Sequence, residues 1–138
     1  MTRYGITLLT VGLVLFVSQA RADDKEDKEK LQGEWSLASV ELNGKSQKIP
    51  GAMYKFEGNK VYASRTGVEE AEGSFDIDSS KKPKTLDMTG KGQLLKAIYE
   101  LDGDTLKICM PGGSDLPRPT EFKSAEKVMV MTLKRVKK

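Results

Sequence analysis

The chain has 138 residues, and its 23 lysines and arginines stand against 20 acidic residues, which gives a formal net charge of +3. Lys and Glu/Asp alternate throughout, whereas a polyanion-binding domain has a clustered basic surface, so the charge pattern argues against nucleic acid as a partner. The chain has no histidine and one cysteine, which argues against hydrolytic or metal chemistry and rules out an intramolecular disulfide.

The first 22 residues have the three parts of a secretory signal peptide. Arg3 gives a positive start, an uninterrupted apolar stretch runs from Gly5 to Val17, and Ala20-Arg21-Ala22 is a small-x-small cleavage site. The apolar stretch is shorter than the ~20 residues that span a bilayer. We therefore expect one mature domain at residues 23–138, without stable membrane insertion after cleavage, in the periplasm or the extracellular space.

A short charged helix is predicted at the start of the mature domain. The segment from Asp23 to Gln32 is rich in helix formers, and Gly33 is a suitable stop. Because the segment has little apolar surface beyond Leu31, we expect the helix to cap the fold rather than to build its core.

The first strand is predicted from Glu34 to Leu42. Trp35 and Leu37 share one face of this strand, while Val40 lies in the opposite phase. A change of phase within one strand indicates a β-bulge, which we expect near Ala38.

Seven more short strands follow, without crossover helices between them. They are predicted at Ala52–Glu57, Lys60–Ser64, Gly73–Asp78, Thr85–Thr89, Leu94–Leu101, Asp104–Met110 and Lys127–Val136. Gly58-Asn59 predicts a tight hairpin, and Asp102-Gly103 predicts a type I′ turn. Alternation places these side chains inward: Tyr54, Phe56, Phe75, Ile77, Leu86, Met88, Leu95, Ala97, Tyr99, Leu101, Leu106, Ile108 and Met110. Eight consecutive strands predict an antiparallel meander, and closing it into a barrel removes both edges.

Two features near the C-terminus concern the outside of this barrel. Pro111 to Pro119 has three prolines and two glycines, so it is predicted to be the longest loop. The last strand is apolar on both faces from Val128 to Met131, which implies a cover on its outer face. The N-terminal segment, the long loop or a second subunit could supply that cover.

Six motifs spread over the mature chain carry a resemblance to a known family. They are Leu31-Gln32-Gly33-x-Trp35, Asn43-Gly44-Lys45, Phe56-Glu57-Gly58, Lys82-Pro83-Lys84-Thr85-Leu86-Asp87, Ile98-Tyr99-Glu100-Leu101-x-Gly103-Asp104-Thr105-Leu106-Lys107-Ile108-Cys109 and Arg118-Pro119-Thr120-Glu121-Phe122. Together they resemble the small lipocalin-like domain abundant in planctomycete exported proteins. The resemblance covers nearly all of the mature chain, and with the predicted elements it implies an all-β, eight-stranded antiparallel up-and-down lipocalin-like barrel with a short N-terminal helix.

More remotely, the chain is similar to true lipocalins, in which a late arginine packs across the tryptophan of an opening Gly-x-Trp. This similarity implies that Gly33, Trp35 and Arg135 are structural residues that close the barrel, with a cation-π contact of roughly 0.5 to 2 kcal/mol. The chain is shorter than a true lipocalin and lacks its long helix, which argues against a large ligand cavity.

The candidate ligand site consists of four inward aromatic side chains and one arginine. Tyr54, Phe56, Phe75 and Tyr99 would line an apolar pocket, although an eight-stranded barrel is either filled by side chains or holds one small ligand. Arg118, in the proline-rich loop, would either meet an anionic head group at the barrel mouth or pin the loop by a salt bridge.

The remaining reactive groups do not form a catalytic or metal signature. Cys109 is predicted to be a passive, partly buried thiol, because little positive charge surrounds it. Glu69-Glu70 and the pair Asp76 and Asp78 lack the spacing of a calcium loop and are interpreted as solvated charge. We therefore predict no enzymatic activity, no cofactor and no metal site.

Two functions are compatible with these features. The first is an exported barrel that binds a small apolar molecule. The alternative is a structural or protein-interaction module of the cell envelope, with a filled barrel and with a protein partner or a second copy on its outer surface.

Overall fold

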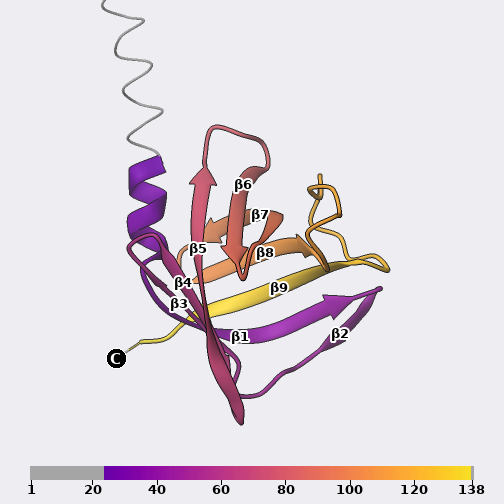
Figure 1. Ribbon diagram of the computed structural model, residues 1–138, viewed down its shortest axis with the longest axis horizontal. Coiled ribbons are helices and arrows are strands. Elements are labelled where there is room, and N and C mark those ends of the chain that lie inside the picture. The colour runs from indigo at the N-terminus through magenta and orange to yellow at the C-terminus, as the bar shows by residue number, and fades with distance from the viewer. Residues whose placement is uncertain (1–23, 138) are drawn as a thin grey trace, which may run out of the picture.

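The computed structural model describes residues 24–137, so the predicted signal peptide lies outside the described residues. A helix occupies residues 24–31 and nine strands follow it (Figure 1). The strands are β1 (Gly33–Leu42), β2 (Lys45–Gln47), β3 (Met53–Glu57), β4 (Lys60–Arg65), β5 (Val68–Asp78), β6 (Lys84–Gly90), β7 (Gln93–Asp102), β8 (Thr105–Pro111) and β9 (Val128–Arg135).

All strand pairs are antiparallel, and eight of the nine strands form a closed barrel. The strands from β3 to β9 pair in chain order, β1 pairs with both β3 and β9, and β2 is an additional strand on the far half of β1. The predicted eight-stranded antiparallel barrel with a short N-terminal helix is thus confirmed. Within residues 24–137, no helix has the length and apolar character needed to cross a membrane.

The predicted bulge in β1 is confirmed by its pairing with β9, in which the register shifts between Leu37 and Ser39. The shift lets β1 change phase without leaving the sheet. As a result Leu37 and Val40, which a regular strand would place on opposite faces, both pack against the barrel core.

Two strands differ from the prediction: β2 is an additional strand, and β5 is longer than expected. β2 was not predicted, and it follows a two-residue turn in which Asn43 and Gly44 both have positive φ, as a type I′ hairpin requires. β5 begins at Val68 instead of Gly73, and it pairs with β4 before β6 reaches it, so the β4–β5 hairpin extends past the barrel wall (Figure 1). Both segments are solvent-exposed, so they lack the apolar alternation from which a strand is recognised.

The prediction of a type I′ turn with Asp102 and Gly103 as its central residues is wrong. Asp102 pairs directly with Thr105, so the central residues of the turn are Gly103 and Asp104, and of these only Gly103 has a positive φ, of 60°. Glycine at the first central position is the pattern of a type II′ turn. This register keeps Leu101 opposite Leu106 inside the barrel.

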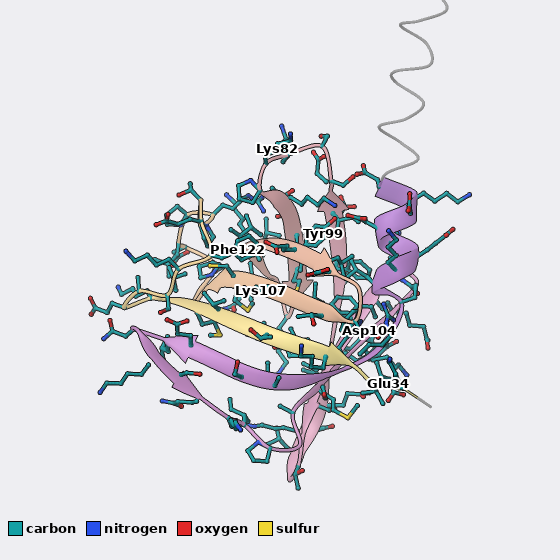
Figure 2. The ribbon with its side chains drawn as sticks, turned by 180° about the vertical axis from the view of Figure 1, so that it is seen from behind. Glu34, Lys82, Tyr99, Asp104, Lys107 and Phe122 are labelled. Atoms are coloured by element: carbon teal, nitrogen blue, oxygen red, sulfur yellow. The ribbon has the colours of Figure 1, made fainter. Side chains whose placement is uncertain are left out.

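The predicted inward side chains form the core, and a second, smaller cluster lies outside the barrel wall. In the second cluster Phe122 packs against Ile98, Cys109 and Val130 on the outer face of β7, β8 and β9 (Figure 2). Phe122 belongs to the loop at residues 112–127, which begins one residue after Pro111, the last residue of β8. The outer face of the last strand is therefore covered by the segment that follows the predicted loop of Pro111 to Pro119, because the observed loop is longer than predicted and extends to residue 127.

Candidate functional site

The two ends of the barrel differ in how they are closed. β1 starts and β9 finishes at the end that carries the helix, where the connections β3–β4, β5–β6 and β7–β8 also lie. The opposite end carries the turns β4–β5 and β6–β7 and the loop at residues 112–127. We call these the closed end and the open end.

At the closed end, the only tryptophan is packed between the helix and an arginine. Trp35 is completely buried, and its indole Nε1 donates a hydrogen bond to the carbonyl oxygen of Leu31 at 2.9 Å. The Arg135 guanidinium carbon lies 4.3 Å from the centroid of the indole ring, within the range of a cation-π contact. Trp35 and Arg135 are directly paired across β1 and β9, so both side chains lie on the inner face.

The same guanidinium also covers the C-terminal end of the helix. Arg135 Nη1 donates to the carbonyl oxygen of Gln32 at 3.1 Å, and Nη2 donates to the carbonyl oxygen of Lys30. A cation at this position satisfies carbonyl groups that lack a helical partner and opposes the negative end of the helix dipole. Gly33 follows with φ of 115°, a conformation that residues with side chains rarely adopt.

A buried carboxylate, which the sequence analysis did not single out, ties the helix to the barrel. Asp27 is 7% exposed, and its Oδ2 accepts hydrogen bonds from the Tyr99 hydroxyl at 2.7 Å and from Lys84 Nζ at 2.8 Å. Burial raises the pKa of Tyr99 above its ordinary value, and the hydrogen bond to Asp27 raises it further. A short charged helix gives no sequence signal that one of its acids will be buried, because the partners are distant in the chain.

The predicted aromatic set divides between the two ends. Phe56 and Phe75 pack edge to face, with ring centroids 5.0 Å apart, and both are almost fully buried in the core. The hydroxyl of Tyr99 donates a hydrogen bond to Asp27 at the closed end. Of the four aromatic residues, Tyr54 is the one that lines the cavities of the open end. The structure therefore does not bring the set together as one pocket wall.

The open end contains two adjoining cavities with mostly apolar walls. The larger has a volume of about 430 Å³, and its lining includes Leu37, Val40, Met129 and Met131 together with residues of β3, β4 and β5. The smaller has a volume of about 200 Å³ and lies toward β6, β7 and β8. Tyr54 contributes to the walls of both cavities.

The space exists because small side chains stand opposite Tyr54. Tyr54 is paired with Ala63 on β4, and Ala63 is paired with Ala71 on β5, so the three form a row across the inner face. Both alanines line both cavities. Larger apolar residues in their place would occupy the space with side chains.

Polar side chains stand at the edge of the larger cavity. Gln47, Ser64, Arg65 and Glu69 line it beside the apolar wall, and the register shift between Ala63 and Arg65 falls at this point of β4. Arg65 was not predicted as a site residue, because nothing in the pattern of a short exposed hairpin indicates that its end lies beside a cavity.

Arg118 lies elsewhere, on the outer face of the barrel. Its Nη2 is 2.7 Å from Asp87 Oδ1, and its Nη1 donates to the carbonyl oxygen of Ala97 at 2.8 Å. It borders an outer depression of about 590 Å³ and does not line either cavity of the open end. These contacts are the ones expected of the loop-pinning alternative.

The thiol and the acidic residues offer no reactive arrangement. Cys109 is fully buried, its Sγ lies 3.4 Å from the carbonyl oxygen of Glu121, and burial raises the pKa of its thiol. Within the described residues, no group of three Cys, Asp or Glu side chains is arranged to hold a metal ion. The apolar cavities are thus the most distinctive feature of the structure that could serve a function.

Comparisons with known proteins do not add to this picture, since no family model, curated protein or solved structure matches the chain.

Proposed function

We propose that the protein is an exported binding module, rather than an enzyme, that holds one small and largely apolar molecule in the open end of its barrel. The observation that carries this proposal is the apolar cavity of about 430 Å³ beside Tyr54. Small-molecule sites are typically concave and mostly apolar, with volumes of about 300–1,000 Å³.

The contrast between the two ends supports this reading. The closed end is packed, and its buried carboxylate has two hydrogen-bond donors, whereas the open end leaves large apolar side chains in contact with solvent. Leu42 is 42% exposed and Val68 is 52% exposed, and both line the larger cavity. A bound apolar ligand would cover part of this surface, with a gain of roughly 25 cal/mol per Å² removed from water.

Export is proposed from the sequence of the first 22 residues, and the barrel agrees with the resemblance to the lipocalin-like domain of planctomycete exported proteins. We propose membership of that family on the same motifs. The packed closed half leaves room for a small ligand only.

The proposal is tested by a substitution that fills the cavity with a larger side chain. Ala63→Ile adds apolar volume where the two cavities adjoin, and it is expected to weaken binding at least about tenfold, because a ligand then meets a filled site. Ser74→Ile makes a similar addition on the exposed outer face of β5 and is the matched control. Arg118→Met should leave binding unchanged, since Arg118 does not line the cavity.

Binding is measured by native mass spectrometry and calorimetry against fatty acids, isoprenoids and aromatics, with displacement of an environment-sensitive dye as a first screen. Trp35 is a poor reporter of the site, because it is buried at the closed end. If the wild type binds nothing in the panel, or if Ala63→Ile and Ser74→Ile bind equally well, the proposal is refuted.

The exposed rim also supports a second candidate, a protein-interaction module. Leu42 and Val68 at the cavity edge and Leu94 on β7, which is 39% exposed, are the large apolar side chains that the described residues leave open to solvent. This candidate predicts that Leu42→Ser with Val68→Ser abolishes self-association or partner binding, while small ligands have no effect. Light scattering and ligand titration of the same samples distinguish the two functions.

A further inference from the structure

Tyr54 occupies a special place in the open end. It lies on β3 in the row with Ala63 and Ala71, and it is shared by the walls of the two cavities. Its side chain is half-buried, and it packs against the core cluster. A ligand that enters either cavity therefore meets the same tyrosine.

The hydroxyl of Tyr54 has a weak partner. Among the described residues, its recorded hydrogen bond goes to the thioether sulfur of Met131, with 3.6 Å between oxygen and sulfur. A thioether is a poor acceptor, whereas buried polar groups in proteins are usually paired with good ones. Tyr99, which is almost fully buried, shows the contrast, because its hydroxyl donates to a carboxylate at 2.7 Å.

The surroundings of this hydroxyl favour uncharged groups. Leu37, Val40 and Met129 line the larger cavity with Tyr54, and burial raises the pKa of the Tyr54 hydroxyl, which reflects the cost of placing a negative charge there. The same cost would apply to a carboxylate bound at that depth. One positive side chain, Arg65, and one negative side chain, Glu69, stand at the edge of the larger cavity, so their charges do not favour a ligand of either sign.

We propose that Tyr54 is the specificity-determining residue of the site and that the ligand is a neutral, largely apolar molecule with a hydrogen-bond acceptor, such as a ketone, ester or quinone carbonyl. The inference rests on the proposed function and names the chemical class of its ligand. On binding, the hydroxyl turns from the sulfur of Met131 to the carbonyl oxygen of the ligand. An alkane-like ligand would leave the hydroxyl with its weak partner.

The test uses three probes of nearly the same shape: 2-acetylnaphthalene, which has a neutral acceptor, 2-ethylnaphthalene, which has none, and 2-naphthoate, which is an anion. Wild-type protein should bind the ketone about 2- to 12-fold more tightly than the ethyl compound, the advantage expected of one net hydrogen bond. It should bind the naphthoate more weakly than the ketone.

Tyr54→Phe keeps the ring and removes the donor. It should remove the advantage of the ketone and leave the affinity for 2-ethylnaphthalene within about twofold of wild type, since packing is retained. Tyr62→Phe is the matched control, because Tyr62 lies on β4 beside Lys55 and lines neither cavity. The infrared carbonyl band of the bound ketone should lie at lower frequency in wild type than in Tyr54→Phe, which a purely structural role would not produce.

The outcomes separate this inference from the proposed function. If Tyr54→Phe weakens the ketone and the ethyl compound equally, or weakens neither, or if naphthoate is the tightest probe, the role of Tyr54 is overturned while the binding site stands. If wild type binds none of the three probes but binds an aliphatic member of the first panel that has no acceptor, the inference alone fails, and if it binds neither the probes nor any member of that panel, the proposed function fails as well.

Discussion

Arg135 joins the helix, the indole of Trp35 and the last strand at the closed end, and replacing it with methionine measures how much these contacts stabilise the fold. Arg135→Met preserves length and apolar bulk but removes the cation above Trp35 and the two hydrogen bonds to the helix carbonyls. It also removes the contact of Nε with Asp104 Oδ1 at 3.3 Å (Figure 2 labels Asp104 at this end). The substitution thus removes one set of contacts between the helix and the barrel wall without creating a cavity, while the hydrogen bonds of Asp27 to Tyr99 and Lys84 remain.

The magnitude follows from the three contacts. A partly exposed cation-π contact contributes about 1 kcal/mol, and each hydrogen bond from a charged donor contributes about 1 kcal/mol when water can replace it. The exposed carboxylate of Asp104 adds little, because surface ion pairs are weak and screened by salt. We expect Arg135→Met to lower the free energy of unfolding by about 2–3 kcal/mol.

The assay is urea denaturation followed by the fluorescence of Trp35, which lies at the affected contact. Lys137→Met is the control, because Lys137 Nζ also pairs with Asp104, at 2.9 Å, but is 75% exposed and touches neither the indole nor the helix carbonyls. The control should unfold with nearly wild-type stability. If Arg135→Met were as stable as Lys137→Met, the guanidinium would not contribute to the closure of the barrel.

Two further changes test the buried groups. The pKa of Tyr99 is raised in the folded protein, so unfolded chains ionise first as pH passes the ordinary value of 10.0, and stability should fall as pH rises further. Tyr99→Phe should make this fall shallower by up to about 1.4 kcal/mol per pH unit, and parallel stability curves would contradict the assignment. Phe122→Ala should expose Cys109 and speed its reaction with a disulfide reagent more than about tenfold, because the reactive thiolate is now hydrated. Leu116→Ala, in the same loop but outside that cluster, should leave the rate unchanged, and equal rates in both variants would show that Phe122 is not the cover.

Apolar alternation was sufficient to predict most of the barrel. Strands with one buried face, such as β6 with Leu86 and Met88 inward, have a pattern that is set by burial itself. β2 has no such pattern, since its three residues are all exposed and the strand exists because the turn at Asn43-Gly44 returns it to β1. Strands that are held by backbone pairing alone leave no periodic signal in the sequence.

The candidate site was only partly predictable, because alternation gives the face on which a residue lies but not its depth along the barrel axis. Phe56 and Tyr54 share the inner face of β3, yet the first is packed in the closed end and the second lines a cavity. The sequence pattern does not predict the path of a long loop either. The same residues were therefore compatible with Arg118 at the barrel mouth and with Arg118 in a salt bridge on the outer face. Ala63 carried no signal at all, since the absence of a large side chain has meaning only beside its neighbours.

The packing of the closed end stabilises the barrel, whereas the cavity of the open end lowers its stability. A site that lowers stability is expected to be kept only if it serves a function. The open cavity of about 430 Å³ leaves apolar side chains in contact with water, and a larger apolar side chain at Ala63 would bury part of that surface. If the space has no use, Ala63→Ile should be both more stable than wild type and unchanged in every function. If the space holds a ligand, the same variant should gain up to about 1–2 kcal/mol and lose binding, the exchange of stability for function that active regions commonly show. Stability and binding measured on one variant therefore decide whether the open end is an unfilled core or a site.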